Sequence, residues 1–160
     1  MEETKNSNYY DRMVEVEKFV DDEKVYGNLT PKRKVSNLLR QLRIYCDKRN
    51  SASRYNSLEK KNPQYKARRE DAEFDEMLSC ARFRKIISIL DDYEFDLLFI
   101  QLRSMLQEGA IEKDVNKRFK IYEYITTAST LIRVDNARVM SQMAQFKNDA
   151  FQLIKDIPTM

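Results

Sequence analysis

The chain has 160 residues, yet it contains only two glycines and three prolines. Average proteins hold about 7% glycine and about 5% proline. The tight turns of sheet-rich folds depend on these residues, so a fold built mainly from strands is nearly excluded. The composition predicts an all-α fold, and we expect a helical bundle with a C-terminal helical hairpin and one long coiled-coil-like helix.

Histidine is absent, which removes the commonest general base and the commonest metal ligand. Cys46 and Cys80 stand alone without a CxxC spacing, so they indicate small buried hydrophobic residues rather than a zinc site. Gly27 and Gly109 lie 82 residues apart and cannot form a phosphate-binding loop. The sequence therefore predicts a protein that is not an enzyme, with no catalytic residue, no metal and no cofactor.

Long apolar runs are also missing, since no stretch approaches the ~20 residues that a membrane-spanning helix needs. The first residues, MEETKNSNYY, are too polar for a signal peptide. Two thiols in a chain rich in Lys and Glu suggest a reducing compartment. We expect a soluble, intracellular protein with no membrane partner, located in the cytoplasm, or in the host cytoplasm if the protein is viral.

Positive charge is concentrated in residues 31–69, which contain 13 Lys or Arg and two acids, for a net charge of +11. The whole chain carries only +3, and the flanking residues 1–30 and 70–100 are net acidic. A segregated basic block is typical of a surface that binds a polyanion. The block predicts a nucleic-acid-binding site formed by Arg33, Lys34, Arg40, Arg43, Lys48, Arg49, Arg54, Lys60, Lys61, Lys66, Arg68 and Arg69.

Two features of the basic block leave its partner open. Tyr45, Tyr55 and Tyr65 are interleaved with the basic residues, and aromatic side chains beside Arg can stack on unpaired bases. A helix, short turn and short helix over residues 31–61 loosely fit a helix-turn-helix, although the turn lacks a glycine. The alternatives are a helical adaptor or inhibitor whose basic face binds an acidic protein, and an RNA-associated helical subunit of a ribonucleoprotein.

Helical periodicity predicts the elements of the N-terminal half. A first helix is expected at residues 9–26. A second helix should open at Thr30 and Pro31, which suit the first positions of a helix, and end near Asn50. Beyond it, the sequence predicts only a short helix at residues 53–61, because large apolar side chains become scarce.

Helix is expected to resume at about Ala72. Asp91 and Glu94 have the spacing of a capping box, in which each residue bonds the backbone of the other at the start of a helix. They predict a helix at residues 92–107 with an apolar core face, ended by Gly109.

The last helix is expected to run from about Glu112 to Ile157, with its weakest stretch at residues 126–130, where hydroxylated and β-branched side chains would permit a bend. From Tyr122 to Leu153, large apolar residues repeat every 3.5 residues, as in the heptads of a coiled-coil seam, and Asn136 sits in the seam as a polar residue that can fix oligomer number. The alternative is a bundle helix that packs on residues 92–107 of its own chain. Because that helix is short, part of the seam would still need a partner. The predicted oligomer interface consists of Ile132, Asn136, Val139, Met143 and Phe146.

The stretch from Arg118 to Ile125, RFKIYEYI, and its continuation through Leu131 and Ile132 to Asn136 resemble the oligomerisation core of small terminase subunits from tailed phages. The resemblance covers residues 92–150 at most. It implies rings of subunits that recognise viral DNA and regulate a separate large subunit carrying the ATPase and nuclease. The N-terminal part departs from that family's pattern, because it shows no clear helix-turn-helix.

These patterns predict two regions. Residues 1–69 would form a basic helical region that contacts nucleic acid, and residues 70–160 a helical hairpin and oligomerisation core. The predicted function is that of a non-enzymatic, oligomeric nucleic-acid-binding protein, in its most specific form one that recognises viral DNA for genome packaging. The expected partners are nucleic acid, with DNA favoured over RNA, further copies of the chain, and a separate motor or nuclease subunit.

Overall fold

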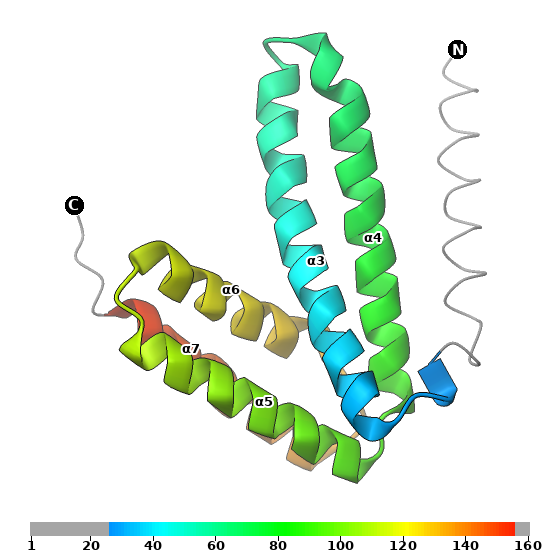
Figure 1. Ribbon diagram of the computed structural model, residues 1–160, viewed down its shortest axis with the longest axis vertical. Coiled ribbons are helices and arrows are strands. Elements are labelled where there is room, and N and C mark those ends of the chain that lie inside the picture. The colour runs from blue at the N-terminus through cyan, green and yellow to red at the C-terminus, as the bar shows by residue number, and fades with distance from the viewer. Residues whose placement is uncertain (1–25, 156–160) are drawn as a thin grey trace. The chain divides into compact units, whose positions relative to one another are not determined.

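The structure is a computed structural model that describes residues 26–155 (Figure 1). Within this range the chain forms helices and no strand, so the predicted all-α class is confirmed. Tyr26 and Gly27 are helical and a turn follows, in which the Leu29 N–H donates to the Tyr26 carbonyl at 3.1 Å. The rest of the helix predicted at residues 9–26 lies outside the described residues.

Contacts divide the described chain into two compact units. The first unit contains residues 26–30 and Asn37–Ile89, and the second contains Pro31–Ser36 and residues 90–155. The sequence placed the boundary between residues 69 and 70 instead. That boundary falls inside a helical hairpin whose two arms bind one another, so the structural division comes later in the chain.

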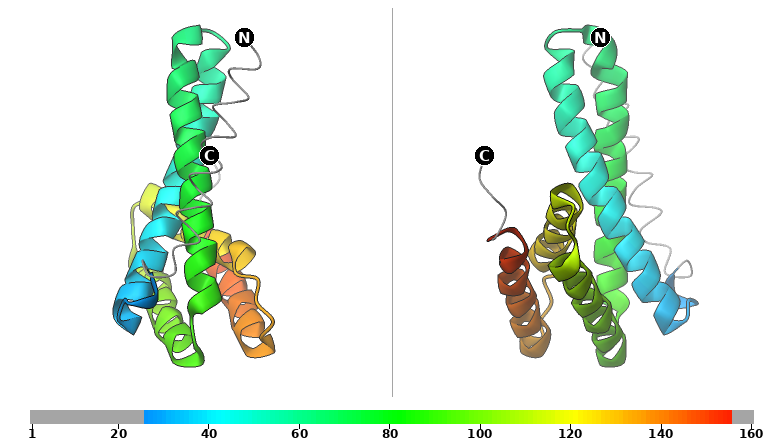
Figure 2. Two further views of the ribbon diagram at one scale, coloured as in Figure 1. Left: turned by 90° about the vertical axis from the view of Figure 1, so that its right-hand side faces the viewer. Right: turned by 60° about the vertical axis from the view of Figure 1, so that its left-hand side comes forward.

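The first unit is a long antiparallel hairpin, and the views of Figure 2 agree in showing its two helices side by side. One arm belongs to α3, which spans Pro31–Glu59, and the other is α4, Lys66–Ile89. A short 3-10 helix, η1 (Pro63–Tyr65), lies in the connection. Helix α3 thus continues well past Asn50, where the sequence predicted its end, and α4 begins earlier than predicted.

The core of the hairpin is apolar and thins toward the connecting turn. Among the apolar residues of α3 from Val35 to Cys46, only Ile44 and Tyr45 are half-buried, and the others are buried. Toward the turn the last fully buried side chains are Ala52 on α3 and Ala72 on α4. Beyond these alanines the two arms are joined by partly exposed contacts, namely ion pairs and a tyrosine stack. The buried apolar residues of the two arms within this unit are Leu38, Leu39, Leu42, Cys46, Ala52, Ala72, Phe83, Ile86 and Ile87.

The second unit is built around three helices, α5 (Asp92–Ile111), α6 (Val115–Leu131) and α7 (Ala137–Lys155). The predicted capping box opens α5: the Glu94 N–H donates to Asp91 Oδ1 at 2.8 Å, and the Asp91 N–H donates to Glu94 Oε1 at 2.9 Å. The other Glu94 oxygen binds Lys34 Nζ at 2.9 Å, although the Glu94 side chain is only 2% exposed. This buried ion pair fixes the first turn of α3 to the start of α5.

The prediction of one C-terminal helix over residues 112–157 is wrong, because residues 132–136 separate α6 from α7, beyond the bend expected at residues 126–130. Ile132 is in extended conformation, with ψ of 107°, and ends α6. The Asn136 side-chain oxygen then accepts the Val139 N–H at 3.2 Å, as a residue at a helix start does. The β-branched Ile132 and Val134 and the cap-forming Asn136 thus favour a turn over a continuous helix.

Gly109 lies inside α5 and does not end it, in contrast to the prediction. A Cβ atom at this position would come within 2.9 Å of Leu153 Cδ1 and 3.3 Å of Ile121 Cγ2. Those two residues belong to α7 and α6, so the three helices converge where α5 has no side chain. The glycine is explained by close helix packing rather than by a helix end.

Candidate nucleic-acid interface

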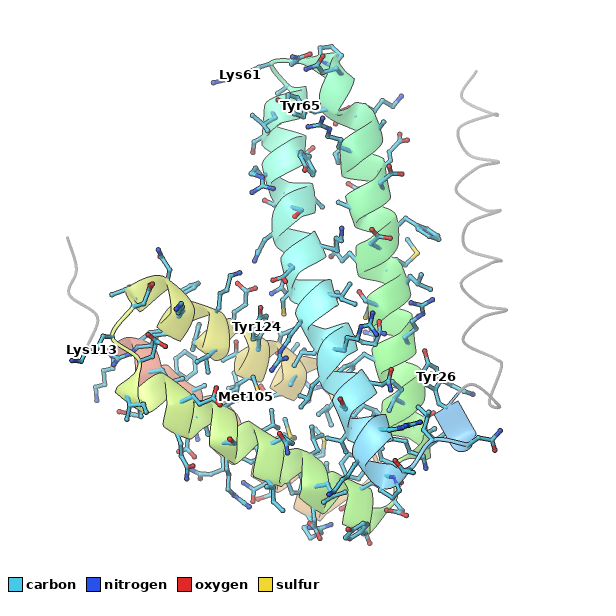
Figure 3. The ribbon with its side chains drawn as sticks, viewed as in Figure 1. Tyr26, Lys61, Tyr65, Met105, Lys113 and Tyr124 are labelled. Carbon is cyan, nitrogen blue, oxygen red and sulfur yellow. The ribbon has the colours of Figure 1, made fainter. Side chains whose placement is uncertain are left out.

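The turn of the α3–α4 hairpin concentrates positive charge, since residues 54–69 contain six basic side chains and one acidic side chain. We call residues 54–69 the basic tip. Figure 3 shows Lys61 and Tyr65 at this end of the hairpin. No residue of the basic tip is fully buried. Local hydrogen bonds and ion pairs, rather than an apolar core, must therefore fix its shape.

Backbone hydrogen bonds reverse the chain at the basic tip. The N–H groups of Lys61 and Asn62 donate to the Leu58 carbonyl at 3.1 and 2.9 Å, which closes the end of α3. The Asn62 side chain then accepts the Gln64 N–H at 3.2 Å, and Pro63 opens η1 behind it. Asn before Pro is a sequence typical of such a turn.

Arg69 ties the two arms of the hairpin together. Its Nε and Nη2 donate to the Glu59 carboxylate on α3, and its Nη1 donates to both Glu73 oxygens at 3.0 and 3.1 Å. These hydrogen bonds raise the pKa of the Arg69 guanidinium further above its ordinary value, chiefly through Glu59. Arg69, which the sequence predicted to contact nucleic acid, is therefore engaged with carboxylates of the hairpin.

Two tyrosines stack across the same turn. The rings of Tyr55 and Tyr65 have centroids 6.1 Å apart and an interplanar angle of 19°. Arg54 lies over the Tyr55 ring at 5.3 Å, and Arg68 lies over the Tyr65 ring at 5.6 Å. Both tyrosines are half-buried. The stacked tyrosines join the two arms of the hairpin. Each ring contacts the other ring and one arginine guanidinium, so the pair also orients Arg54 and Arg68.

The remaining cations of the basic tip are open to solvent. Its exposed basic residues are Arg54, Lys60, Lys61, Lys66 and Arg68. The one acidic residue of the tip, Glu59, is bound by Arg69. The tip therefore presents five exposed cations, and its one carboxylate is already paired with Arg69.

A second set of cations lies along α3. Arg40, Arg43 and Arg54 are exposed, and Arg40 and Arg54 are 14 residues apart, which places them on one helix face. At 1.5 Å per residue they are separated by about 21 Å along the axis. Asp47 lies on the same face and partly offsets this charge. The line of arginines extends the basic surface from the tip along the arm.

Other predicted contact residues have partners inside their own units. Lys34 binds the buried Glu94, as described above, so its ammonium is withdrawn from solvent. Lys48 lies 3.4 Å from Asp75 on α4, and Arg49 lies over the Tyr45 ring at 5.2 Å. Arg33 is exposed and belongs to the second unit.

Acidic residues near the start of α4 interact with basic residues of the hairpin. Glu73 and Asp75 pair with Arg69 and Lys48. Burial raises the pKa of the Glu76 carboxyl, and the nearby Arg49 partly opposes that rise. Among residues 26–155, no group of three potential metal-binding side chains comes together. Glu73 thus neutralises a basic residue of the tip, and Asp75 neutralises one farther along the hairpin.

The predicted oligomer seam lies inside the second unit. Ile132, Val139, Met143 and Phe146 are each at most 1% exposed, and Asn136 starts α7 instead of occupying a seam. Phe146 packs against Phe99 of α5, with ring centroids 5.8 Å apart. The interpretation of these residues as an exposed seam is therefore wrong, and they form the core of a bundle within one chain. Self-association stays a prediction and would need another surface.

One exposed feature of the second unit was not predicted from the sequence. Phe119 and Tyr122 on α6 and Phe151 on α7 form an aromatic cluster, with Val115 one turn before Phe119. The signal was present, since apolar residues at 115, 119 and 122 share one helix face. The heptad assignment hid it, because it placed Tyr122 in a seam with the core residues of α7.

Comparison with protein-family models, with curated proteins and with solved structures finds no match to this chain. Within residues 26–155, no helix has the length and apolar character that crossing a membrane requires. The site must accordingly be interpreted from its own chemistry.

Proposed function

We propose that this protein is a non-enzymatic nucleic-acid-binding protein that contacts the phosphate backbone with its basic tip. Five exposed cations gather at one end of a helical hairpin, and the single carboxylate among them is already paired with Arg69. This arrangement is the observation that carries the proposal. A polyanion would meet positive charge there without displacing an internal carboxylate.

The tyrosine pair favours phosphate contact over base stacking. Tyr55 and Tyr65 stack on one another, and an arginine lies over each ring. An unpaired base would have to displace these contacts before it could stack. Phosphate contacts require only the exposed Lys and Arg side chains, and such contacts carry no sequence information. Binding should therefore depend on ionic strength and only weakly on sequence.

The resemblance of residues 92–150 to small terminase subunits gives the proposal its most specific form. In that form the ligand is viral DNA, the context is genome packaging, and a separate motor or nuclease subunit completes the assembly. Self-association would place several basic tips on one assembly, and linked sites bind a long polyanion far more tightly than one site does. This specific form of the proposal is supported by the helical pattern in the sequence of residues 92–150 and by the basic tip.

The test is a titration of a labelled duplex of random sequence at several salt concentrations, followed by fluorescence anisotropy. Log affinity should fall linearly with log salt, with a slope of about −0.9 for each phosphate contact. A triple variant, Lys60→Gln with Lys61→Gln and Lys66→Gln, should weaken binding and reduce the slope by up to about 3. These side chains are exposed, so the fold should be unaffected.

A matched control removes three exposed lysines from the second unit, Lys113→Gln with Lys117→Gln and Lys120→Gln. The control has the same net charge as the tip variant, so it should keep the wild-type affinity if the tip is the site. Equal losses in both variants would show that net charge alone drives binding. If wild-type protein retains no duplex at low salt, the proposal is wrong, and an acidic protein becomes the better candidate partner.

A further inference from the structure

Exposed apolar side chains gather on one face of the second unit. Val115, Phe119 and Phe151 are 46%, 48% and 44% exposed, and Tyr122 lies between the two phenylalanines. The ring centroids of Tyr122 lie 5.6 Å from Phe119 and 5.5 Å from Phe151. We call these four residues the aromatic patch. Single exposed apolar residues are ordinary, but a contiguous aromatic group is typical of an interaction surface.

The patch spans two helices that are packed on each other. Val115, Phe119 and Tyr122 follow one face of α6 at helical spacing, and Phe151 comes from α7, which runs antiparallel to it. Near the same end, Gly109 approaches Ile121 and Leu153, so the backbone below the patch is tightly held. The patch thus lies on two helices that also pack closely against α5.

Lysines flank the patch on α7. Lys147 and Lys155 lie four residues before and four residues after Phe151, so both share its side of the helix, and both are exposed. The nearest acid on α7, Asp149, accepts a hydrogen bond from Gln145 at 2.9 Å. On α6, Glu123 is half-buried and has a partner within the chain. The border beside Phe151 is therefore positive.

The charges beside the aromatic patch and the angles between its rings indicate which kind of partner fits the patch. A second copy docked patch to patch would bring like charges together, because each copy contributes Lys147 and Lys155. A stack of unpaired bases would need parallel ring faces, yet Tyr122 is tilted by 48° from Phe119 and by 56° from Phe151. An amphipathic helix fits both features, because its apolar stripe would contact the rings and carboxylates beside that stripe would face the lysines.

We propose that the aromatic patch binds an amphipathic helix of a partner protein, with an apolar stripe against Phe119, Tyr122 and Phe151 and acidic residues beside Lys147 and Lys155. Helix-in-groove recognition of this kind uses apolar anchors at successive turns. The aromatic side chains supply most of the affinity, because large rings dominate such interfaces. The lysines favour a partner helix with acidic flanking residues over one with basic flanking residues.

The probes are two synthetic helical peptides of about 20 residues, long enough to form helix on binding. Both carry the same leucine stripe, one with Glu and the other with Lys at the flanking positions. Fluorescence anisotropy with the full chain should show binding of the Glu peptide. Phe119→Ala with Phe151→Ala should weaken it about tenfold or more. Ile100→Ala, at an exposed apolar site on α5, is the matched control and should change nothing.

A charge swap tests the lysines separately. Lys147→Glu with Lys155→Glu should weaken the Glu peptide and strengthen the Lys peptide, with an unchanged melting temperature. Equal binding of both peptides, or no effect of either double variant, would overturn the proposal. So would a lower mass of the phenylalanine variant in light scattering, which would assign the patch to a second copy. Loss of single-stranded DNA binding in that variant, with peptide binding intact, would assign it to bases instead.

Discussion

The two units of this chain use their charged residues in opposite ways. In the hairpin, burial ends at Ala52 and Ala72, and the basic tip beyond them has no fully buried side chain. In the second unit, a charged residue enters the core itself, since Glu94 is buried with Lys34 as its partner. The hairpin thus concentrates exposed cations at its tip, whereas the second unit holds an ion pair in its core that fixes a helix start.

This difference predicts which substitutions affect stability and which affect binding. The bundle core derives its stability from buried side chains such as Met143 and Phe146, so a charge placed there must be desolvated. The basic tip rests on partly exposed ion pairs, which contribute little to stability. Substitutions in the bundle should therefore change the unfolding free energy, whereas those at the tip should change affinity for polyanions.

The largest expected effect is that of Met143→Glu. Met143 is 1% exposed, so a carboxylate there would lie in the apolar core and should lower the unfolding free energy by several kcal/mol. Because domains have only about 5–15 kcal/mol in total, helical circular dichroism should be largely lost. Met143→Leu is the control and should remain folded. A Met143→Glu protein that stays folded but loses mass in light scattering would instead restore the predicted oligomer seam.

A smaller effect is expected from Asn136→Ala. The substitution removes the side-chain acceptor for the Val139 N–H at the start of α7, which should cost about 1 kcal/mol. Urea denaturation should show this loss. Asn136→Ser keeps an acceptor for the Val139 N–H without placing a carboxylate beside Asp92, which lies 3.3 Å from the Asn136 amide nitrogen, and should retain most of the stability. If Asn136→Ala changes the oligomeric mass without changing stability, the residue acts between chains and not as a cap.

The smallest effect on stability is expected from Arg69→Gln. Its ion pairs with Glu59 and Glu73 are partly exposed, so their loss should lower the unfolding free energy by less than about 1 kcal/mol. The freed carboxylates should nevertheless weaken duplex binding, because the tip would then carry unpaired negative charge. Arg68→Gln makes the same charge change without freeing a carboxylate. A large fall in melting temperature for Arg69→Gln would mean that the tip is structural.

The sequence predicted features that depend on short spacings. The capping box at Asp91 and Glu94 and the helix start at Pro31 follow from residues within one turn, and the structure contains both. The all-α class likewise follows from composition alone. These predictions succeeded because local hydrogen bonding and chain stiffness decide them.

The features that failed depend on contacts between distant residues. Helix α3 extends to Glu59 because Arg69 and Tyr65, beyond the turn, bind its last residues. The heptad pattern over residues 122–153 was real, but the turn at Asn136 folds it into two packed helices. The net charge of the basic block could not reveal that Lys34 pairs with Glu94, or that Arg69 pairs with Glu59 across the turn, since both pairings depend on how the helices fold back on one another.

The short turn at Lys60, Lys61 and Asn62 also has a consequence for how the hairpin tolerates change. These residues are exposed and non-helical, and the hydrogen bonds around them involve only neighbouring residues. Sites of this kind accept inserted sequence most readily, since an insertion disturbs no buried contact. The hairpin could thus acquire a tag, or an entire additional module, at its far end.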